Sequence, residues 1–395
     1  MDNEKRVPKL RFPGFTDAWE QRKLSDVADF NPKSVLPDIF EYVDLESVVG
    51  TEMVSHRTEN RITAPSRAQR LAKTGDVFFQ TVRPYQKNNY LFTKPDTNYV
   101  FSTGYAQMRP KINAEFLMCF LQTDDFVQVV LDNCTGSSYP AINSTDLSKL
   151  HIVLPVSEAE QEKIGKTIRG LDNLITLHQR KLDKLSSLKK AYLEKMFPKK
   201  GKLYPELRFA GFTDAWEQRK LGDVAKYRNG KAHENDIEEK GEFIVVNSKF
   251  VSTDGEVKKY SHSQIEPLLK NEIAFVLSDV PNGRAIARTF LVDKSGKYTL
   301  NQRIAGITPF DKTYPYFLHI LMNRNKYFLK FDDGVKQTNL SVADVMNFEE
   351  MYPCYEEQSK IGTFFENLDS LITLHQRKCD ALKNAKKFFL QNMFV

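Results

Sequence analysis

Arginines, amides and aromatic side chains gather in two short stretches of this 395-residue chain, and they are the residues best suited to chemistry. Arg with Asn and Gln can form paired hydrogen bonds to guanine and adenine edges in the major groove of DNA. Residues 57–87 hold seven cations against two acids, and residues 282–303 hold five cations against one. Such mixtures also cover many soluble proteins, so they favour DNA contact without requiring it. The candidate DNA contacts are Arg57, Arg61, Arg67, Arg70, Arg83, Tyr85, Lys87, Asn282, Arg284, Arg288, Lys297, Arg303 and Lys336.

Catalytic and cofactor motifs are missing from the chain. It has no glycine-rich phosphate loop, no dinucleotide fingerprint and no serine elbow. Asn31-Pro32-Lys33 departs at its third position from the loop that holds an exocyclic amine in amino-methyltransferases. Pro37-Asp38 and Pro95-Asp96 could each open a metal-dependent nuclease site, but no obvious Glu-x-Lys strand follows. The seven histidines are scattered and the four cysteines form no Cys-x-x-Cys pair. We therefore expect no catalytic residue, bound metal or cofactor on this chain.

The charge of the chain is unevenly distributed. Its 57 Lys and Arg against 51 Asp and Glu give a net charge of +6. Segment 29–153 sums to −2 and segment 226–350 to +1, so the rest of the chain carries +7. Any nucleic-acid surface on these two segments must therefore be local. No run of about 18 apolar residues occurs, and the cysteine usage fits a reduced compartment, so we expect a cytoplasmic protein with no membrane span.

A tandem duplication organises the sequence. Residues 10–28 and 207–225 are identical at 17 of 19 positions, at an offset of 197 residues. The octapeptide LITLHQRK at 174–181 reappears unchanged at 371–378, at the same offset. Between these repeated parts, the segments near 29–153 and 226–350 match only in scattered places. We therefore expect one fold in two copies, with surfaces that read two different things.

The end of each repeat is helical by its periodicity. Apolar residues recur every three or four positions from 157 to 197 and again in the second copy, over four heptads that fit a pair of coiled-coil helices. Ser157 and Glu160 are spaced as a capping box at the first helix start, and Pro198 follows its end. His178 and His375 occupy one seam position, where a polar side chain that fixes the register is the simplest interpretation.

Each head mixes strand and helix patterns, which predicts an α+β domain of about 125 residues. A turn at 73–76 should lead into a buried strand in the first head, and residues 272–277 predict the matching strand in the second. Residues 115–131 and 315–331 read as helices. Trp19 and Trp216, just before each head, are expected to pack in the core.

The ordered set of phrases in both repeats resembles the specificity subunit of a type I restriction-modification system along nearly the whole chain. The phrases are Trp19 to Leu24, Gly75 to Phe79, Leu154-Pro155 with Glu160-Gln161 and Lys163-Ile164, and Leu171-Asp172, with counterparts at Trp216 to Leu221, Tyr352-Pro353, Glu357-Gln358 with Lys360-Ile361, and Leu368-Asp369. No phrase is specific alone. One departure is an extra residue between Pro155 and Gln161, which puts the symmetry of the two copies in doubt.

This resemblance implies two target recognition domains, each reading one half of an asymmetric DNA site, and two long helices packed antiparallel as a ruler. It implies two methyltransferase subunits docked on the helices, which bring S-adenosylmethionine, and restriction subunits that use ATP and Mg. The activity would lie at the bacterial nucleoid. Loops from Gly136 to Ile142 and from Gly334 to Leu340 are expected near DNA. The expected partner-binding positions on the helices are Ile164, Ile168, Ile175, His178, Ile361, Phe365, Ile372 and His375.

The expected parts are a first target recognition domain at 1–155, a central helix at 156–199, a second target recognition domain at 200–353 and a C-terminal helix at 354–395. The function expected from them is non-catalytic recognition of double-stranded DNA. The alternative is a two-headed coiled-coil scaffold whose heads bind proteins. An enzyme with an unrecognised site is a third interpretation.

Overall fold

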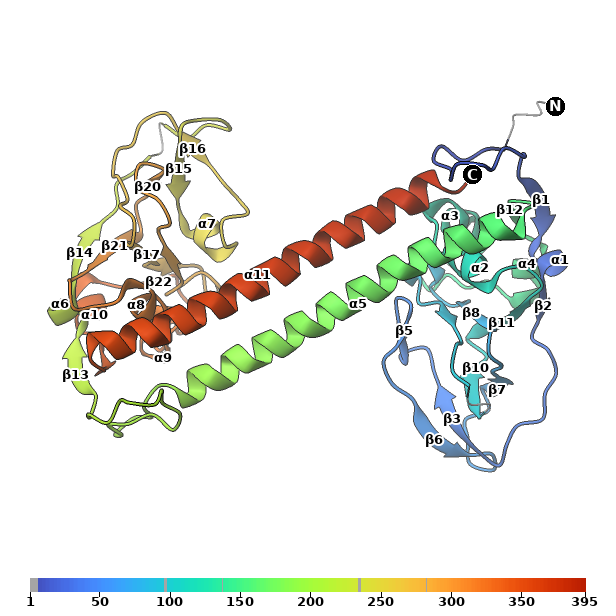
Figure 1. Cartoon of the computed structure of the whole chain (residues 1–395), viewed down its shortest axis with the longest axis horizontal. Helices are drawn as coiled ribbons and strands as arrows, with labels where there is room; N and C mark the ends of the chain where they lie inside the picture. The colour runs from blue at the N-terminus through green and yellow to red at the C-terminus, as the bar shows by residue number, and fades with distance from the viewer. Residues whose placement is uncertain (1–5, 96–97, 137, 234–235, 282) are drawn as a thin grey trace. The chain divides into compact units, whose positions relative to one another are not determined.

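The computed structural model describes residues 6–95, 98–136, 138–233, 236–281 and 283–395. The chain forms two compact units. Unit one combines the chain up to residue 181 with residues 375–395, and unit two comprises residues 182–374. Each unit therefore contains one head and a part of each of two long helices (Figure 1).

The head of unit one contains two four-stranded sheets. Their strand orders are β6-β3-β10-β7, in which β10 lies parallel to β3, and β2-β11-β8-β9, in which all pairs are antiparallel. The strands are β1 (Glu20–Lys23), β2 (Ala28–Phe30), β3 (Ile39–Val43), β4 (Val48–Val49), β5 (Glu52–Met53), β6 (Arg57–Asn60), β7 (Ala68–Leu71), β8 (Val77–Gln80), β9 (Tyr90–Leu91), β10 (Tyr99–Ser102), β11 (Tyr105–Pro110) and β12 (His151–Leu154). The short helices are α1 (Leu24–Val27), the 3-10 turn η1 (Pro84–Gln86), α2 (Ala114–Phe120), α3 (Asp124–Asp132) and α4 (Ser144–Lys149).

The head of unit two repeats this plan. Its sheets have the orders β16-β15-β20, with β15 parallel to β20, and β14-β21-β17-β19. The strands are β13 (Glu217–Lys220), β14 (Ala225–Asn229), β15 (Phe243–Val246), β16 (Tyr260–Ser261), β17 (Ile273–Val276), β18 (Ser278–Asp279), β19 (Thr289–Leu291), β20 (Tyr298–Leu300), β21 (Ile304–Pro309), β22 (Thr338–Asn339) and β23 (Glu349–Tyr352). The short helices are α6 (Leu221–Val224), α7 (Ser248–Ser252), α8 (Pro315–Met322), α9 (Lys326–Leu329) and α10 (Val342–Met346). The α+β fold class is confirmed for both heads.

The buried strands expected from the sequence are confirmed as β8 and β17. All four residues of each strand are buried, because each strand has a core on both faces. In β8, Val77 and Phe79 face one core while Phe78 faces the other. In β17, Ile273 and Phe275 alternate in the same way with the residues between them. A strand that is covered on both faces reads as a continuous apolar run.

The helices expected at 115–131 and 315–331 are each broken into two. In unit one, the Thr123 side chain accepts a hydrogen bond from the Phe126 N–H and starts α3 afresh after α2. In unit two, Asn325 caps α9 in the same way after α8 has ended. The prediction of one continuous helix was wrong, because periodicity does not register an internal cap.

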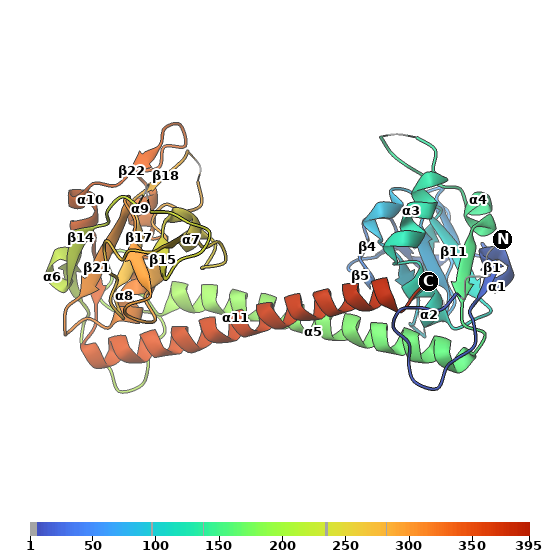
Figure 2. The same cartoon turned by 90° about the horizontal axis from the view of Figure 1, so that it is seen from above.

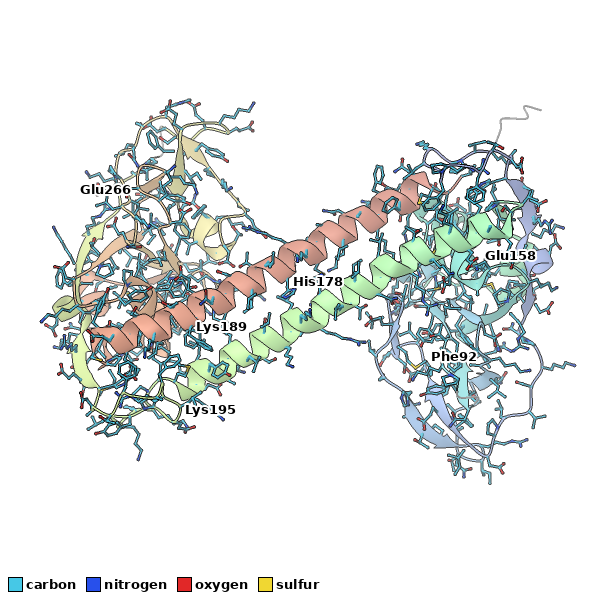
Figure 3. All side chains as sticks on the ribbon, in the orientation of Figure 1. Phe92, Glu158, His178, Lys189, Lys195 and Glu266 are labelled. Carbon is cyan, nitrogen blue, oxygen red and sulfur yellow. The ribbon has the colours of Figure 1, made fainter. Side chains whose placement is uncertain are left out.

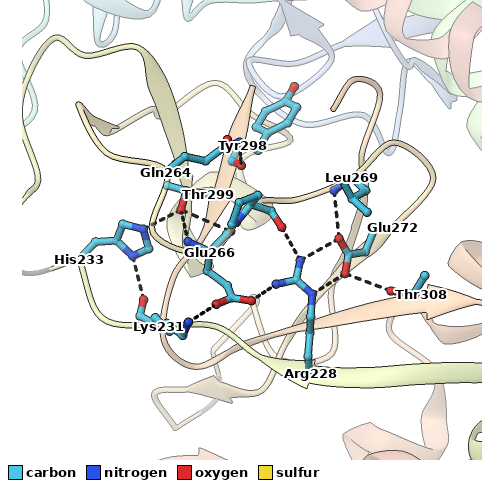
Figure 4. A network of polar contacts seen from close by, with 11 residues as sticks. Arg228, Lys231, His233, Gln264, Glu266, Leu269, Glu272, Tyr298, Thr299 and Thr308 are labelled. Carbon is cyan, nitrogen blue, oxygen red and sulfur yellow. Dashed lines mark hydrogen bonds and ion pairs between the residues drawn. The ribbon is translucent and has the colours of Figure 1, made fainter. Parts of the chain in front are cut away.

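An ion-pair network anchors β17 in unit two (Figure 4). Arg228 of β14 donates two hydrogen bonds to Glu272, at 2.7 and 2.8 Å, and Thr308 of β21 adds a third at 3.1 Å. In unit one, Asp76 lies at the position equivalent to Glu272. Both of its carboxylate oxygens accept a hydrogen bond from Arg109 of β11, each at 2.9 Å. The two heads therefore fix the start of the same buried strand with an arginine from different strands, the adjacent β11 in unit one and β14, beyond β21, in unit two.

The two long helices are α5 (Glu158–Lys195) and α11 (Tyr355–Asn392), each of 38 residues and about 57 Å long. They run antiparallel within each unit. In unit one, Asp172 of α5 pairs with Lys386 of α11 at 2.6 Å. In unit two, Lys189 of α5 pairs with Asp369 of α11 at 2.5 Å. The two ion pairs are equivalent, because Asp172 and Asp369 lie 197 positions apart in the sequence and so do Lys189 and Lys386. The helix that supplies the acid in one pair supplies the lysine in the other. Figure 3 shows His178 on the face of α5 that is turned toward α11.

Each long helix starts in one head and ends in the other. Ile164 and Ile168 of α5 lie in the core of unit one, which also contains Phe394. The end of the chain, marked C in Figure 2, lies beside α2 of this head. Phe394 packs edge-on against Trp19 at 6.3 Å. In unit two, the core contains Met196 just after α5, together with the start of α11. The expected burial of both tryptophans is confirmed, at 3% and 2% exposure.

The extra residue of the first repeat is absorbed in the connection before α5. Arg11 binds Glu160 through two hydrogen bonds, at 2.7 and 2.8 Å, and Arg208 binds Glu357 in the same way at 2.7 Å. The start of each helix is thus locked identically to its head. Within the parts of the chain that are described, no helix is long and apolar enough to cross a membrane.

Candidate nucleic-acid interface

Two backbone segments meet at one end of the head of unit one. Val82 bridges Ala141, and the Arg83 N–H donates to the Pro140 carbonyl at 2.8 Å. We call residues 81–87, together with 133–136 and 138–142, the rim of unit one. The loop from Gly136 to Ile142, which was expected near DNA, therefore lies against the first basic stretch.

The rim carries Arg83, which is half-buried, and two exposed tyrosines. The Arg83 guanidinium lies over the Tyr139 ring, 4.5 Å from its centroid. Tyr139 is 64% exposed and Tyr85 is 50% exposed. Among the described residues, no carboxylate lies within ion-pair distance of Arg83. Its hydrogen-bond donors are therefore available to a ligand.

A cavity of about 360 Å³ opens beside Arg83. Its polar lining comprises Arg83, Glu46 and three amides, of which Gln80 is the most buried. The Gln80 amide nitrogen donates to the Val82 carbonyl at 2.6 Å and to Gln86 at 2.9 Å, which fixes the orientation of the amide. The lining residues are Leu45, Glu46, Val48, Val49, Gln80, Val82, Arg83, Gln86 and Asn88. Amides and a guanidinium against apolar walls suit a planar group with hydrogen-bonding edges.

Two of the first-stretch cations are paired with acids of the head, and a third is partly buried. Arg57 bonds Asp44 and Glu59, each at 2.7 Å. Lys87 pairs with Asp124 at 2.5 Å, and its hydrogen bond lowers the pKa of that carboxyl. Burial lowers the pKa of Arg70, whose Nε is buried without a partner. These residues are held by the fold, so they are less available to DNA than Arg83.

Two other cations of the first stretch, Arg61 and Arg67, are exposed. The Arg67 carbonyl accepts the Thr103 N–H at 2.8 Å, and the neighbouring Gly104 carbonyl accepts the Thr81 N–H at 3.0 Å. Arg67 is therefore close to the rim through its backbone. Arg61 follows β6, on the other sheet of the head.

Unit two carries an equivalent rim, defined by residues 278–281, 283–288 and 334–340. Its two segments pair as β18 with β22, through Ser278 with Asn339 and Asp279 with Thr338. Arg303 lies beside them, since its carbonyl accepts the Leu277 N–H at 3.0 Å. The loop expected at 334–340 is thus again placed against the second basic stretch.

The remaining candidates of unit two divide by position. Arg284, Arg288 and Lys336 lie on the two segments of the rim, and the Arg288 Nε donates to the Arg284 carbonyl at 2.7 Å. Lys297 lies instead before β20 and pairs with Asp293 at 3.1 Å. Asn282 lies outside the described residues. The rim therefore carries Arg284, Arg288 and Lys336, with Arg303 beside it.

The equivalent rims carry opposite charges at one position. Val82 pairs with Ala141 as Ser278 pairs with Asn339, so the residue after each is Arg83 in unit one and Asp279 in unit two. The Asp279 carboxylate accepts the N–H groups of the following loop, among them those at 285 and 286, at 2.5 and 3.0 Å. One backbone framework therefore presents a free cation in one head and a bound acid in the other.

The expected partner-binding positions of the long helices are mostly internal. Ile164, Ile168, Ile361 and Phe365 are at most 2% exposed, in the cores of their own units. The seam positions are partly buried; they are Ile175, His178, Ile372 and His375. The repeated octapeptide instead exposes other side chains, which the heptad pattern did not single out. They are Leu174, Leu177, Leu371 and Leu374, each 45–47% exposed.

Tyr139 was also missed as a contact candidate from the sequence. The signal for it was its position in the Gly136 to Ile142 loop, but its proximity to Arg83, 56 residues earlier, depends on the fold. The described part of the chain places no three His, Cys, Asp or Glu side chains to hold a metal ion.

The two α+β heads share one backbone framework and differ in the polar side chains of their rims. The family model of the type I restriction modification DNA specificity domain matches residues 48–187 and 213–384, one match in each repeat. The chain belongs to this family.

Curated relatives agree with this assignment, and a solved structure shares the fold. The specificity subunit of the type I restriction enzyme HindI from Haemophilus influenzae is 26% identical over 193 residues, which are 45% of this chain and 40% of that protein. The MjaVIII specificity subunit from Methanocaldococcus jannaschii is 23% identical over 273 residues, or 64% of this chain and 63% of that protein. The chain thus matches less than two thirds of each relative's length. The crystal structure of a type I restriction-modification system S subunit from M. genitalium has the same fold, with a TM-score of 0.72, 16% identity and coverage of 98% and 99% of the two chains.

Proposed function

We propose that this chain is the DNA specificity subunit of a type I restriction-modification enzyme, and that each head reads one half of an asymmetric DNA site. The observation that carries this proposal is the opposite charge at one position of two equivalent rims, Arg83 and Asp279. A shared backbone with unlike side chains suits two readers of different sequences. Family membership supports the same conclusion.

The chain itself is non-catalytic in this proposal, and its partners are two methyltransferase subunits in the cytoplasm. Those subunits would bring S-adenosylmethionine, and restriction subunits would bring the ATP- and Mg-dependent steps. The support on this chain is the octapeptide, which is identical in both long helices and exposes the same two leucines in each. Two identical apolar surfaces suit two copies of one partner.

The docking surface can be tested separately from the DNA surface. Leu174→Lys combined with Leu371→Lys should weaken binding of the methyltransferase subunit by at least roughly tenfold, since a desolvated apolar contact becomes charged. Phe388→Lys, on α11 but outside the octapeptide, is a matched control, because this side chain is also exposed. Calorimetric titration of the partner into each variant measures the effect. Equal binding by the leucine variants would remove this surface from the proposal.

DNA recognition is tested by salt and by sequence. Neutralising about four phosphates should cost roughly a hundredfold in affinity between 50 and 200 mM salt. A protein-binding scaffold with apolar contacts would show little such dependence. Mapping methylated adenines genome-wide, with and without this gene, should show one bipartite motif that disappears on deletion. Methyl transfer by the purified chain alone would contradict a non-catalytic role.

A further inference from the structure

On the rim of unit one, the Arg83 guanidinium is stacked over the ring of Tyr139. The guanidinium lies 4.5 Å from the centroid of a ring that is itself 64% exposed. A guanidinium on a ring face keeps its N–H edge free for ligands, and the contact reduces the freedom that the side chain would lose on binding. The pair therefore presents a positioned planar set of donors.

The loop that carries Tyr139 is fixed by its own backbone. Thr135 and Ala141 exchange two backbone hydrogen bonds, at 2.9 and 3.0 Å. Gly136 lies between them with a φ of +86°, and a Cβ there would meet the Tyr139 carbonyl oxygen at 3.1 Å. Arg83 is joined to the same loop through the Pro140 carbonyl and has a φ of +54°. The backbone on both sides of the pair is thus held before any ligand arrives.

The acceptor that suits this arginine has two oxygen or nitrogen atoms in one plane. On DNA these are the O6 and N7 of guanine, or two phosphate oxygens. A phosphate contact is the same for every sequence, so two heads that share a backbone framework would be expected to keep it. Unit two has Asp279 at the equivalent position instead, with its carboxylate bound to its own loop. The position therefore varies in the way that a base-reading position should.

We propose that Arg83 reads a guanine in the half-site of unit one by donating to its O6 and N7, and that Tyr139 is the positioning residue that holds the guanidinium for this contact. This inference rests on the proposed function, which supplies DNA as the ligand. The amide wall of the adjacent cavity, with Gln86 and Asn88, offers donors and acceptors for neighbouring bases.

The test uses the target duplex found by methylation mapping, with each guanine of the half-site replaced in turn by 7-deazaguanine, which has C–H in place of N7. Affinity is measured for the full chain with the partner subunits that it needs. The DNA affinity of the wild type should fall roughly tenfold when one particular guanine is replaced by 7-deazaguanine. This is the lower part of the range for a lost paired contact. The affinity of Arg83→Ala should not fall further when that guanine is replaced. Any affinity loss caused by replacing the other guanines should remain in this variant. Arg22→Ala, which removes an exposed arginine of β1 that is not among the candidate DNA contacts, should behave as the wild type.

Two variants of Tyr139 distinguish a role in positioning Arg83 from a role in folding. Tyr139→Phe keeps the ring and should keep the tenfold penalty, whereas Tyr139→Ala should reduce it, with thermal unfolding unchanged in both because the side chain is exposed. A half-site without guanine in either strand, or an Arg83→Ala variant that retains the deazaguanine penalty, would overturn the inference. A uniform loss for all sequences with a salt slope smaller by about one would assign Arg83 to a phosphate, and also overturns it. Absence of DNA binding by the wild-type complex would instead reject the proposed function.

Discussion

At the scale of single residues, buried charge is used to fix the heads on the helices. Glu160 and Glu357 are each 1% exposed, and each accepts two hydrogen bonds from an arginine 149 residues earlier in the chain. A buried carboxylate is tolerated when it is paired and hydrogen-bonded. The pair therefore links the start of each repeat to the start of its long helix.

Arg11→Ala should destabilise unit one strongly, because it leaves Glu160 buried without its cation. The expected loss is about 3–5 kcal/mol in the free energy of unfolding. Arg22→Ala is the matched control, since its pair with Glu20 is exposed and should contribute less than about 1 kcal/mol. Urea unfolding of the three proteins measures the difference. Equal stability of the two variants would show that Glu160 finds another partner or water.

At the scale of elements, the long helices depend on close contacts at specific positions. Gly165 of α5 lies against α2, where a Cβ would meet the Phe116 amide nitrogen at 2.7 Å. Gly362 occupies the equivalent position in α11, where a Cβ would meet the Tyr314 ring. Gly170, five residues further along α5, has no atom within 4 Å of its Cβ position.

Two glycines of one helix should therefore respond in opposite directions to alanine. Gly165→Ala is expected to cost about 1–3 kcal/mol, because backbone must shift to make room. Gly170→Ala should stabilise by about 0.5–1 kcal/mol, because alanine forms helix better than glycine. Thermal unfolding followed by circular dichroism compares the two. A stabilising Gly165→Ala would mean that α2 and α5 can separate without cost.

The seam histidines make the helix pair of unit one sensitive to acid. The Nδ1 atoms of His178 and His375 are 2.8 Å apart, so one ring must donate and the other accept. Burial, the second ring and the nearby Lys378 and Lys181 lower the pKa of His178. Its contribution to stability is therefore complete above the ordinary histidine pKa of about 6.5 and is lost as the pH falls below it.

Replacing both rings by a neutral pair tests this dependence. His178→Gln with His375→Gln should lose less stability than the wild type between pH 7.5 and pH 5.5, since glutamine does not titrate. Urea unfolding at both values provides the comparison. His319, whose pKa burial lowers to about 4, titrates in both proteins and cancels in the difference. Parallel losses in the two proteins would show that the histidine pair stays bonded in acid.

At the scale of the whole molecule, each long helix is shared between two units and each unit needs both helices. The reciprocal pairs Asp172–Lys386 and Lys189–Asp369 repeat one contact with the helices exchanged. A change of length in one helix alone would break this register. We therefore expect the lengths of α5 and α11 to act together in setting the distance between the half-sites.

Seven residues inserted into both helices, after residue 181 and after residue 374, should lengthen the tolerated DNA spacer. Seven helical residues span about 10.5 Å, which corresponds to about three base pairs. The two half-sequences should stay the same, because neither rim is altered. Methylation mapping in cells that carry the variant measures both. The same insertion in α5 alone is the control and should abolish activity, and an unchanged spacer would reject the ruler.

The sequence alone determined the duplication, the helical period of the repeat ends, the buried strands at 77–80 and 273–276 and the burial of both tryptophans. These features depend on local pattern or on direct repetition, which a linear sequence records. It also pointed to the basic stretches and to the loops that form the rims. It did not register the caps that break α2 from α3 and α8 from α9, because a single side chain decides them.

Only the tertiary structure decided which candidates are free to bind. Arg57 and Lys87 are paired with acids that lie 2 and 37 residues away in the sequence, while Arg83 contacts the Tyr139 ring and, among the described residues, no acid. These outcomes depend on strand pairing. The tertiary structure also decided that the apolar residues at the helix starts, such as Ile164 and Ile361, are buried in the cores, and that the leucines of the octapeptide stay exposed. The physical reason is distance along the chain. The pairs that fix the units join residues 149 to 214 positions apart, and composition or period carries no information on such partners.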